Sequence, residues 1–133
     1  MSDETQNPIR AAIAEAIAEN SVILFMKGSP DQPMCGFSAR TAARLQALDV
    51  PFAAVDVLPD PRIRQELSAL SGWPTIPQLF HHGELIGGAD IVGEMYESGE
   101  LAQVLGVEPG GEPVHEPEAP AGGPLLGIEN RPG

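Results

Sequence analysis

The strongest constraint on the fold is a continuous apolar run, Val22-Ile23-Leu24-Phe25-Met26. A run without polar alternation is typical of a strand that is buried on both faces of a sheet. Residues 52–57 predict a second strand, and residues 35–48 between the two have helical periodicity. Because a crossover helix between buried strands requires parallel pairing, these segments predict an α/β domain with helices on both faces of its sheet.

The other elements follow from caps, prolines and turns. A first helix is predicted over residues 8–19, and a third helix begins at Asp60-Pro61, with Ile63, Leu67 and Leu70 facing inward. Strands are predicted over 78–80 and 84–86, joined by a turn at 81–83. A last helical region starts at about residue 90 and has a break at Gly99. The order is helix, then β-α-β-α-β-β-α. The closing hairpin adds antiparallel pairing, so the sequence predicts a mixed four-stranded sheet.

The character of the sequence changes near residue 107. Residues 1–107 predict one domain, whereas residues 108–133 form an acidic tail rich in glycine and proline, without a periodic apolar pattern. Such a segment cannot bury enough apolar surface to offset its ordering entropy, so we expect it to be disordered. The short patch Leu125-Leu126-Gly127-Ile128 is compatible with a docking motif, although a solvated tail is the simpler interpretation.

The charge balance excludes some partners. The chain has seven Lys and Arg against 19 Asp and Glu, a formal net charge of -12. Phosphate contacts need basic residues, so neither nucleic acid nor an anionic membrane surface is an expected partner. The N-terminus is acidic and polar, unlike a secretory signal. We expect a cytoplasmic, bacterial-type location, or an organelle matrix if a transit segment has been removed.

Cys35 is the only cysteine, which rules out an internal disulfide and a multi-cysteine zinc site in one chain. It follows a loop and opens a predicted helix. Free N–H groups at a helix start favour negative charge, so the thiol pKa is expected to be lowered there, with Lys27 adding a nearby cation. A buried, inert cysteine is the alternative, but the position between Pro33 and Gly36 favours a reactive thiolate.

Two further motifs border predicted strands. Trp73-Pro74-Thr75-Ile76-Pro77 precedes the third strand, where a cis bond before Pro77 would expose the Ile76 backbone to an extended peptide. An ordinary strand-entry turn is the alternative. Gly87-Gly88-Ala89-Asp90 follows the last strand and suits an anion-binding turn at a helix start, with helix capping by Asp90 as the simpler interpretation.

Taken together with Met26-Lys27-Gly28 and Cys35-Gly36-Phe37-Ser38, these motifs resemble those of monothiol glutaredoxins of the CGFS type, in the same order and spacing. The resemblance spans about residues 7–107. It implies a thioredoxin-like fold that binds glutathione. Cys35 would be both the active thiol and the ligand of a [2Fe–2S] cluster.

The resemblance also implies a glutathione-binding set. Its members are Lys27, Phe37, Arg64, Thr75, Ile76, Pro77, Gly88, Ala89 and Asp90. Lys27 and Arg64 would hold the carboxylates, the Ile76 backbone would pair with the cysteinyl unit, and Ala89 with Asp90 would hold the γ-glutamyl group. Arg62 is close enough to Arg64 to leave that choice open. An aromatic residue is common in the family at the position of Ile76, so ring packing is lost here.

The function implied is storage of a dimer-bridging [2Fe–2S] cluster and its transfer to apo-proteins, with glutathione supplying the missing thiolates. The rival is a glutathione-dependent oxidoreductase that deglutathionylates proteins, which needs only one cysteine. A third possibility is a regulatory module that pairs with a BolA-like protein. Expected partners are therefore glutathione, a second copy of the chain, a BolA-like protein and the cluster recipients.

Overall fold

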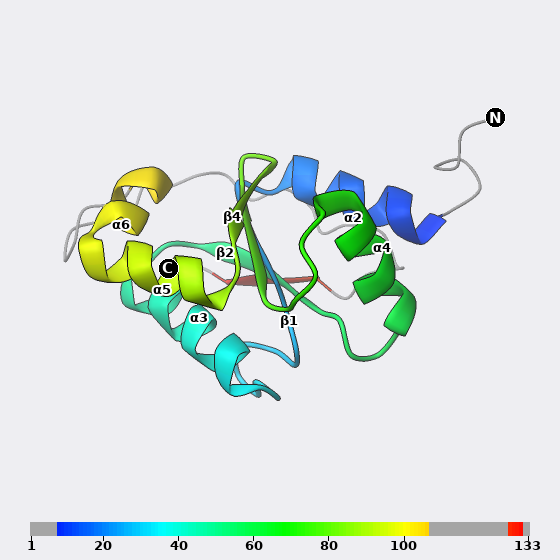
Figure 1. The fold of residues 1–133 in the computed structure, drawn as a ribbon, viewed down its shortest axis with the longest axis horizontal. Coiled ribbons are helices and arrows are strands. Elements are labelled where there is room, and N and C mark those ends of the chain that lie inside the picture. Colours follow the sequence, from blue (N-terminus) through cyan, green and yellow to red (C-terminus); the bar gives the residue numbers. More distant parts are fainter. Residues whose placement is uncertain (1–7, 107–127, 132–133) are drawn as a thin grey trace.

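A computed structural model describes residues 8–106 and 128–131 of the 133-residue chain. Its elements are α2 (Pro8–Glu19), β1 (Val22–Met26), α3 (Gly36–Ala47), β2 (Phe52–Asp56), α4 (Pro61–Ser71), β3 (Gln78–His81), β4 (Glu84–Gly87), α5 (Ala89–Ser98), α6 (Glu100–Leu105) and β5 (Ile128–Arg131). No described helix is long and apolar enough to cross a membrane. Figure 1 shows these helices arranged around one sheet.

The predicted thioredoxin-like sheet is confirmed. The strand order is β4-β3-β1-β2-β5, with β1 and β2 parallel and β3 antiparallel to both β1 and β4. β1 is buried along its whole length, as its apolar run predicts. The crossover helix α3 is what makes the parallel pairing of β1 with β2 possible.

Two apolar cores lie on opposite faces of the sheet, because side chains along each strand alternate between the faces. In β1, Leu24 faces the core beneath α3, α5 and α6, whereas Phe25 faces the core beneath α2 and α4. The expected inward positions Ile63 and Leu67 are buried in the second core. Leu70 was also expected to face inward, but it is 39% exposed because it lies at the end of α4, beyond the close packing.

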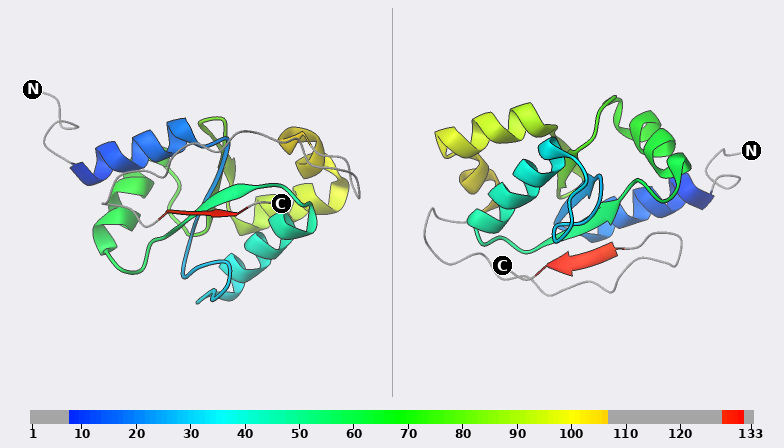
Figure 2. Two further views of the ribbon diagram at one scale, coloured as in Figure 1. Left: turned by 180° about the vertical axis from the view of Figure 1, so that it is seen from behind. Right: turned by 90° about the horizontal axis from the view of Figure 1, so that it is seen from below.

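The fifth strand corrects part of the tail prediction. Residues 128–131, expected to be disordered, form β5 and pair antiparallel with β2, from Val55 opposite Ile128 to Phe52 opposite Arg131. Figure 2 shows β5 in red, alongside β2 at the edge of the sheet. The rest of the predicted tail, residues 108–127 and 132–133, lies outside the described residues.

Candidate functional site

The strand directions bring the predicted site residues to one edge of the sheet. The register places Met26 beside Asp56 and Phe25 beside Gln78, so β1 and β2 end where β3 begins. The hairpin returns β4 to that edge, with Gly87 opposite Leu79. This end of the sheet, where the strands end or begin, is therefore bordered by Lys27, the starts of α3 and α4, the segment before Pro77 and the Gly-Gly turn.

The loop before Cys35 is held closed by backbone hydrogen bonds. Met34 N donates to Lys27 O over 2.9 Å, and Ser29 and Gln32 exchange backbone bonds of 3.2 and 3.1 Å. Gly28 has φ of +88°, and a Cβ there would lie 2.5 Å from Gln32 O. Only glycine fits this backbone approach, so Gly28 sets the path of the chain into the thiol.

Cys35 is the N-cap residue of α3, in extended conformation, and its side chain is half-buried. The pKa of its thiol is lowered below the ordinary value, first by a hydrogen bond from the Ser38 backbone N–H. Burial opposes this, and the Phe37 backbone N–H, the Lys27 charge and the Ser38 hydroxyl lower the pKa further. The structure thus agrees with the expected effect of a helix start, which acts through specific N–H donors.

Ser38 has a role that sequence reasoning missed. It is fully buried, and its Oγ accepts a hydrogen bond from the Lys27 backbone N–H over 3.1 Å. Because that bond uses the oxygen as acceptor, the hydroxyl proton is free to donate to the Cys35 sulfur. In the sequence, Ser38 stood out only as the last residue of the motif Cys35-Gly36-Phe37-Ser38.

Asp56 was also missed, although it is a carboxylate at the end of a buried strand. Its Oδ1 accepts hydrogen bonds of 2.9 Å from the backbone N–H groups of Gly28 and Leu58. These bonds tie the thiol loop to the end of β2. A charged residue at the end of an otherwise apolar strand was the signal that could have revealed it.

The surface around the thiol is apolar and bears cations. Met34 and Phe37 are 68% and 52% exposed, and Leu58, next to Asp56, is 48% exposed. The Arg40 guanidinium lies 5.2 Å from the Phe37 ring centroid, a cation–π contact. Exposed apolar side chains next to a reactive group are typical of a surface that meets another molecule.

The peptide bond before Pro77 is cis, as the sequence motif suggested. Ile76 and Pro77 are buried, and Thr75 is exposed. Gln78 is fully buried, and its Nε2 donates to Trp73 O and Thr75 O over 3.0 and 3.1 Å. This side chain, which was not singled out from the sequence, ties the loop at Trp73 and Thr75 to the start of β3.

The Gly-Gly turn touches this segment. A Cβ on Gly88 would lie 2.8 Å from the Trp73 indole nitrogen and 3.3 Å from Pro77 O. Gly88 is itself the N-cap of α5, so the expected capping by Asp90 is wrong: Asp90 lies in the first turn. Ala89 is half-buried and Asp90 exposed, which leaves the helix start open to an anion.

The two candidate arginines at the start of α4 differ in their partners. Arg62 is bound to the cap residue Asp60, with an Nη2–Oδ2 distance of 2.8 Å. Arg64 is exposed and forms no salt bridge with the described residues. Arg64 is therefore the arginine whose charge is available to a ligand.

Among the described residues, Cys35 is the one side chain that offers a thiolate ligand to a metal. They contain no group of three or more His, Cys, Asp or Glu side chains able to hold a metal ion. His81 and His82 stack edge-to-face on each other, with centroids 4.3 Å apart. With one cysteine in its sequence, the chain can supply one thiolate to a metal.

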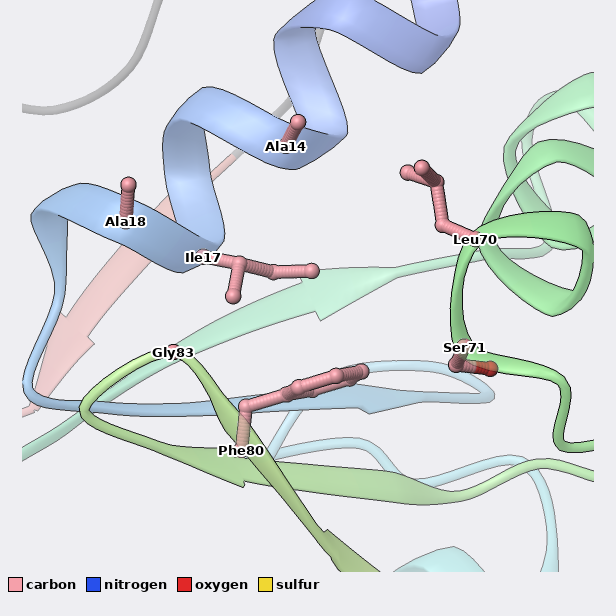
Figure 3. A pocket seen from close by; sticks show the side chains of 7 residues that line it. All are labelled: Ala14, Ile17, Ala18, Leu70, Ser71, Phe80 and Gly83. Atoms are coloured by element: carbon pink, nitrogen blue, oxygen red, sulfur yellow. The ribbon is translucent and has the colours of Figure 1, made fainter.

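A separate pocket lies between α2, α4 and the β3–β4 turn. Its volume is about 290 Å³ and its lining is Ala14, Ile17, Ala18, Leu70, Ser71, Phe80 and Gly83. Figure 3 shows the Ile17, Leu70 and Phe80 side chains around it. None of the predicted site residues lines this pocket, and it offers no thiol or ionisable group for chemistry.

Comparisons with known proteins show which proteins this chain resembles. A family model for glutaredoxin matches residues 22–86. Glutaredoxin 4 of Escherichia coli K12 is 54% identical over 93 residues, 70% of this chain and 81% of that protein. A truncated mutant of Trypanosoma brucei 1-C-Grx1 superposes with a TM-score of 0.67 at 43% identity, covering 72% of this chain and 87% of its own.

A more distant neighbour shows the same fold. Buckwheat glutaredoxin, solved as a glutathione complex, superposes with a TM-score of 0.68 over 80% of this chain and 94% of its own, at 22% identity.

Proposed function

The chain belongs to the glutaredoxin family, as a member with a single cysteine, and from this premise we propose that it binds glutathione beside Cys35 and carries a [2Fe–2S] cluster between two copies of itself. The observation that supports the proposal most is the half-buried thiol at the start of α3, whose pKa is lowered by N–H donors. A thiolate is the form of cysteine that binds iron.

Glutathione would bind along the edge of the sheet described above. Lys27 and Arg64 offer two cations for its two carboxylates, and the Ile76 backbone offers strand-like pairing for its cysteinyl unit. Ala89 and Asp90 at the start of α5 would receive the γ-glutamyl end through backbone N–H groups. Phe37, Thr75, Pro77 and Gly88 would complete the contact surface. The buckwheat neighbour, of the same fold, was solved as a complex with glutathione.

Counting ligands gives the stoichiometry of the proposed cluster complex. A [2Fe–2S] cluster takes four thiolates, and one chain supplies one. Two chains and two glutathione molecules together supply four. In this proposal Cys35 is the protein's ligand, and its half exposure lets a second copy approach.

Cluster transfer to apo-proteins follows from this arrangement, because half of the ligands are small molecules that can dissociate. The exposed Met34, Phe37 and Leu58 would contact the second copy, a BolA-like protein or a recipient. A thiol that has to remain reduced suits the reducing bacterial cytoplasm, where we place the protein.

Anaerobic reconstitution with iron, sulfide and glutathione tests the proposal. We expect a coloured dimer from the wild type and a colourless monomer from Cys35→Ser. Omission of glutathione provides the matched control, which should also remain colourless. A wild-type protein that stays colourless and monomeric under all conditions would refute cluster binding.

The same thiolate supports the rival, deglutathionylation, because a lowered pKa also increases the fraction available for attack on a mixed disulfide. In that reaction Cys35 would take the glutathionyl group from the protein substrate and release the substrate thiol. A second glutathione would then attack the mixed disulfide between Cys35 and glutathione. This step releases glutathione disulfide and restores the Cys35 thiol. Rapid turnover of a glutathionylated peptide by cluster-free monomer would favour this second function.

A further inference from the structure

The β2 side of the sheet carries a strand that lies outside the matched family region. The glutaredoxin family model ends at residue 86, whereas β5 is formed by residues 128–131. In the observed order β4-β3-β1-β2-β5, β2 would be the outermost strand if β5 were absent. β5 therefore determines whether the backbone of β2 is paired or open on its outer side.

β2 itself has little that protects an edge strand, since its one charged residue, Asp56, lies at its end. Its sequence, Phe52-Ala53-Ala54-Val55-Asp56, has no lysine and no proline, and its pairing with β1 runs over four consecutive positions without a register shift. Its first four residues are buried. Open edges that are regular and uncharged are templates for pairing with another strand, and proteins usually block them with charges, prolines, bulges or a covering segment.

The contacts of β5 are those of a covering segment. It pairs with β2 at four consecutive positions, and Ile128, opposite Val55, packs against the core beneath α2 and α4. β5 is the outermost strand of the sheet on this side, and its sequence includes the charged residues Glu129 and Arg131. Figure 2 shows β5 beside β2 in both views.

Residues 128–131 occupy the outer edge of β2. We propose that this edge is a strand-acceptor surface, and that β5 prevents a second copy of this chain from pairing with it. Two β2 edges related by a two-fold axis can pair antiparallel, because the same strand is then presented by both partners. Residues 52–55 carry no charge, so the paired strands themselves add nothing to the repulsion that arises from the net charge of -12. This association is independent of Cys35 and of glutathione.

The test compares three full-length proteins without iron or glutathione and with a reductant present, so that thiol chemistry does not contribute. They are the wild type, a variant with residues 128–131 replaced by Gly-Ser-Gly-Ser, and a control with residues 119–122 replaced in the same way. Both replaced segments have a net charge of zero, so the overall charge is matched. Far-UV circular dichroism verifies folding, and a milder Ile128→Ser variant is measured in parallel.

Hydrogen exchange of residues 52–55 and the mass in solution over a range of concentrations are the readouts. We expect at least tenfold faster exchange in the dilute strand-replaced variant and its association at high concentration, with a smaller effect for Ile128→Ser. The wild type and the control should remain protected monomers. Unchanged exchange would overturn the pairing of β5, and faster exchange without association would overturn the second copy as the excluded partner.

Discussion

At the scale of single residues, Ser38 contacts both the loop that begins at Lys27 and the thiol of Cys35. Its buried oxygen accepts from the Lys27 backbone N–H, and both its backbone N–H and its hydroxyl help to lower the pKa of Cys35. The serine three residues after the only cysteine thus helps to stabilise the thiolate of that cysteine. This follows from three-dimensional contacts, which explains why sequence spacing alone did not reveal it.

Replacing Ser38 by alanine should raise the pKa of Cys35, because the hydroxyl donor is lost. The pKa should stay below that of a free cysteine, since the backbone N–H of residue 38, the largest cause of the shift, remains. Leaving the Lys27 N–H without its acceptor should also cost about 1 kcal/mol of stability. The pH dependence of Cys35 alkylation measures the pKa, and urea unfolding measures the stability.

Thr41→Val is the matched control for this substitution. Thr41 is equally buried in α3, but its hydroxyl donates to Phe37 O rather than to the thiol. It should lower stability by a similar amount and leave the alkylation profile unchanged. Equal shifts in both variants would show that the effect on Cys35 is merely structural.

The lowered pKa of Cys35 also has a consequence for stability. The unfolded chain has the higher thiol pKa, so the thiolate stabilises the folded state at pH values above the unfolded pKa. This contribution is lost as the pH falls through the folded pKa. The difference in unfolding free energy between wild type and Cys35→Ser should therefore shift in favour of the wild type as the pH rises through this interval.

The arginine pair gives a second prediction at this scale. Arg64→Ala should weaken glutathione binding about tenfold, or ~1.4 kcal/mol, because it removes a charge-assisted contact. Arg62→Ala should have little effect on affinity, since Arg62 is already paired with Asp60. Isothermal titration of each variant with glutathione measures this. A larger loss in Arg62→Ala than in Arg64→Ala would exchange the roles of the two residues.

At the scale of elements, the ends of the strands assemble the site. β1, β2 and β4 end, and β3 begins, at one edge of the sheet, so loops that are distant in the sequence meet there. Trp73 links two of them, because its indole lies against Gly88 at the start of α5. The motifs were visible in the sequence, but this contact was not, since it depends on how the two loops pack.

Gly88→Ala should disturb this contact. A methyl group would lie 2.8 Å from the Trp73 indole nitrogen, so the ring has to move. We expect a loss of about 1–3 kcal/mol and a shift in the emission of Trp73, the only tryptophan. Gly93→Ala in the same helix is the control. Its methyl group would meet only the flexible Arg44 side chain, so emission should not change.

The periodic elements could be predicted because each is encoded locally, by an apolar run, a cap or a turn. Asp60 caps α4 as its sequence indicated, accepting from the Arg62 N–H over 3.0 Å. β5 could not be predicted in this way. Its four residues lie between Gly127 and Pro132 and become a strand through pairing with β2, a non-local contact. Leu70 had the right spacing, but its place at the helix end leaves it exposed.

At the scale of the whole molecule, the chain is strongly acidic, although cations lie in the segments of its proposed site. The formal net charge is -12, yet Lys27, Arg40 and Arg64 lie in segments that border the thiol edge. These cations offer charged partners to a small anion such as glutathione, while the overall charge opposes close approach of two copies. The proposed dimer therefore depends on the bridging ligands to hold it together.

The most direct test of this account is native mass spectrometry of protein reconstituted without oxygen. We predict one species that contains two chains, two glutathione molecules and one [2Fe–2S] cluster, and that is absent when glutathione is omitted or Cys35 is replaced by serine. A cluster held by a single chain, or by two chains without glutathione, would contradict the account.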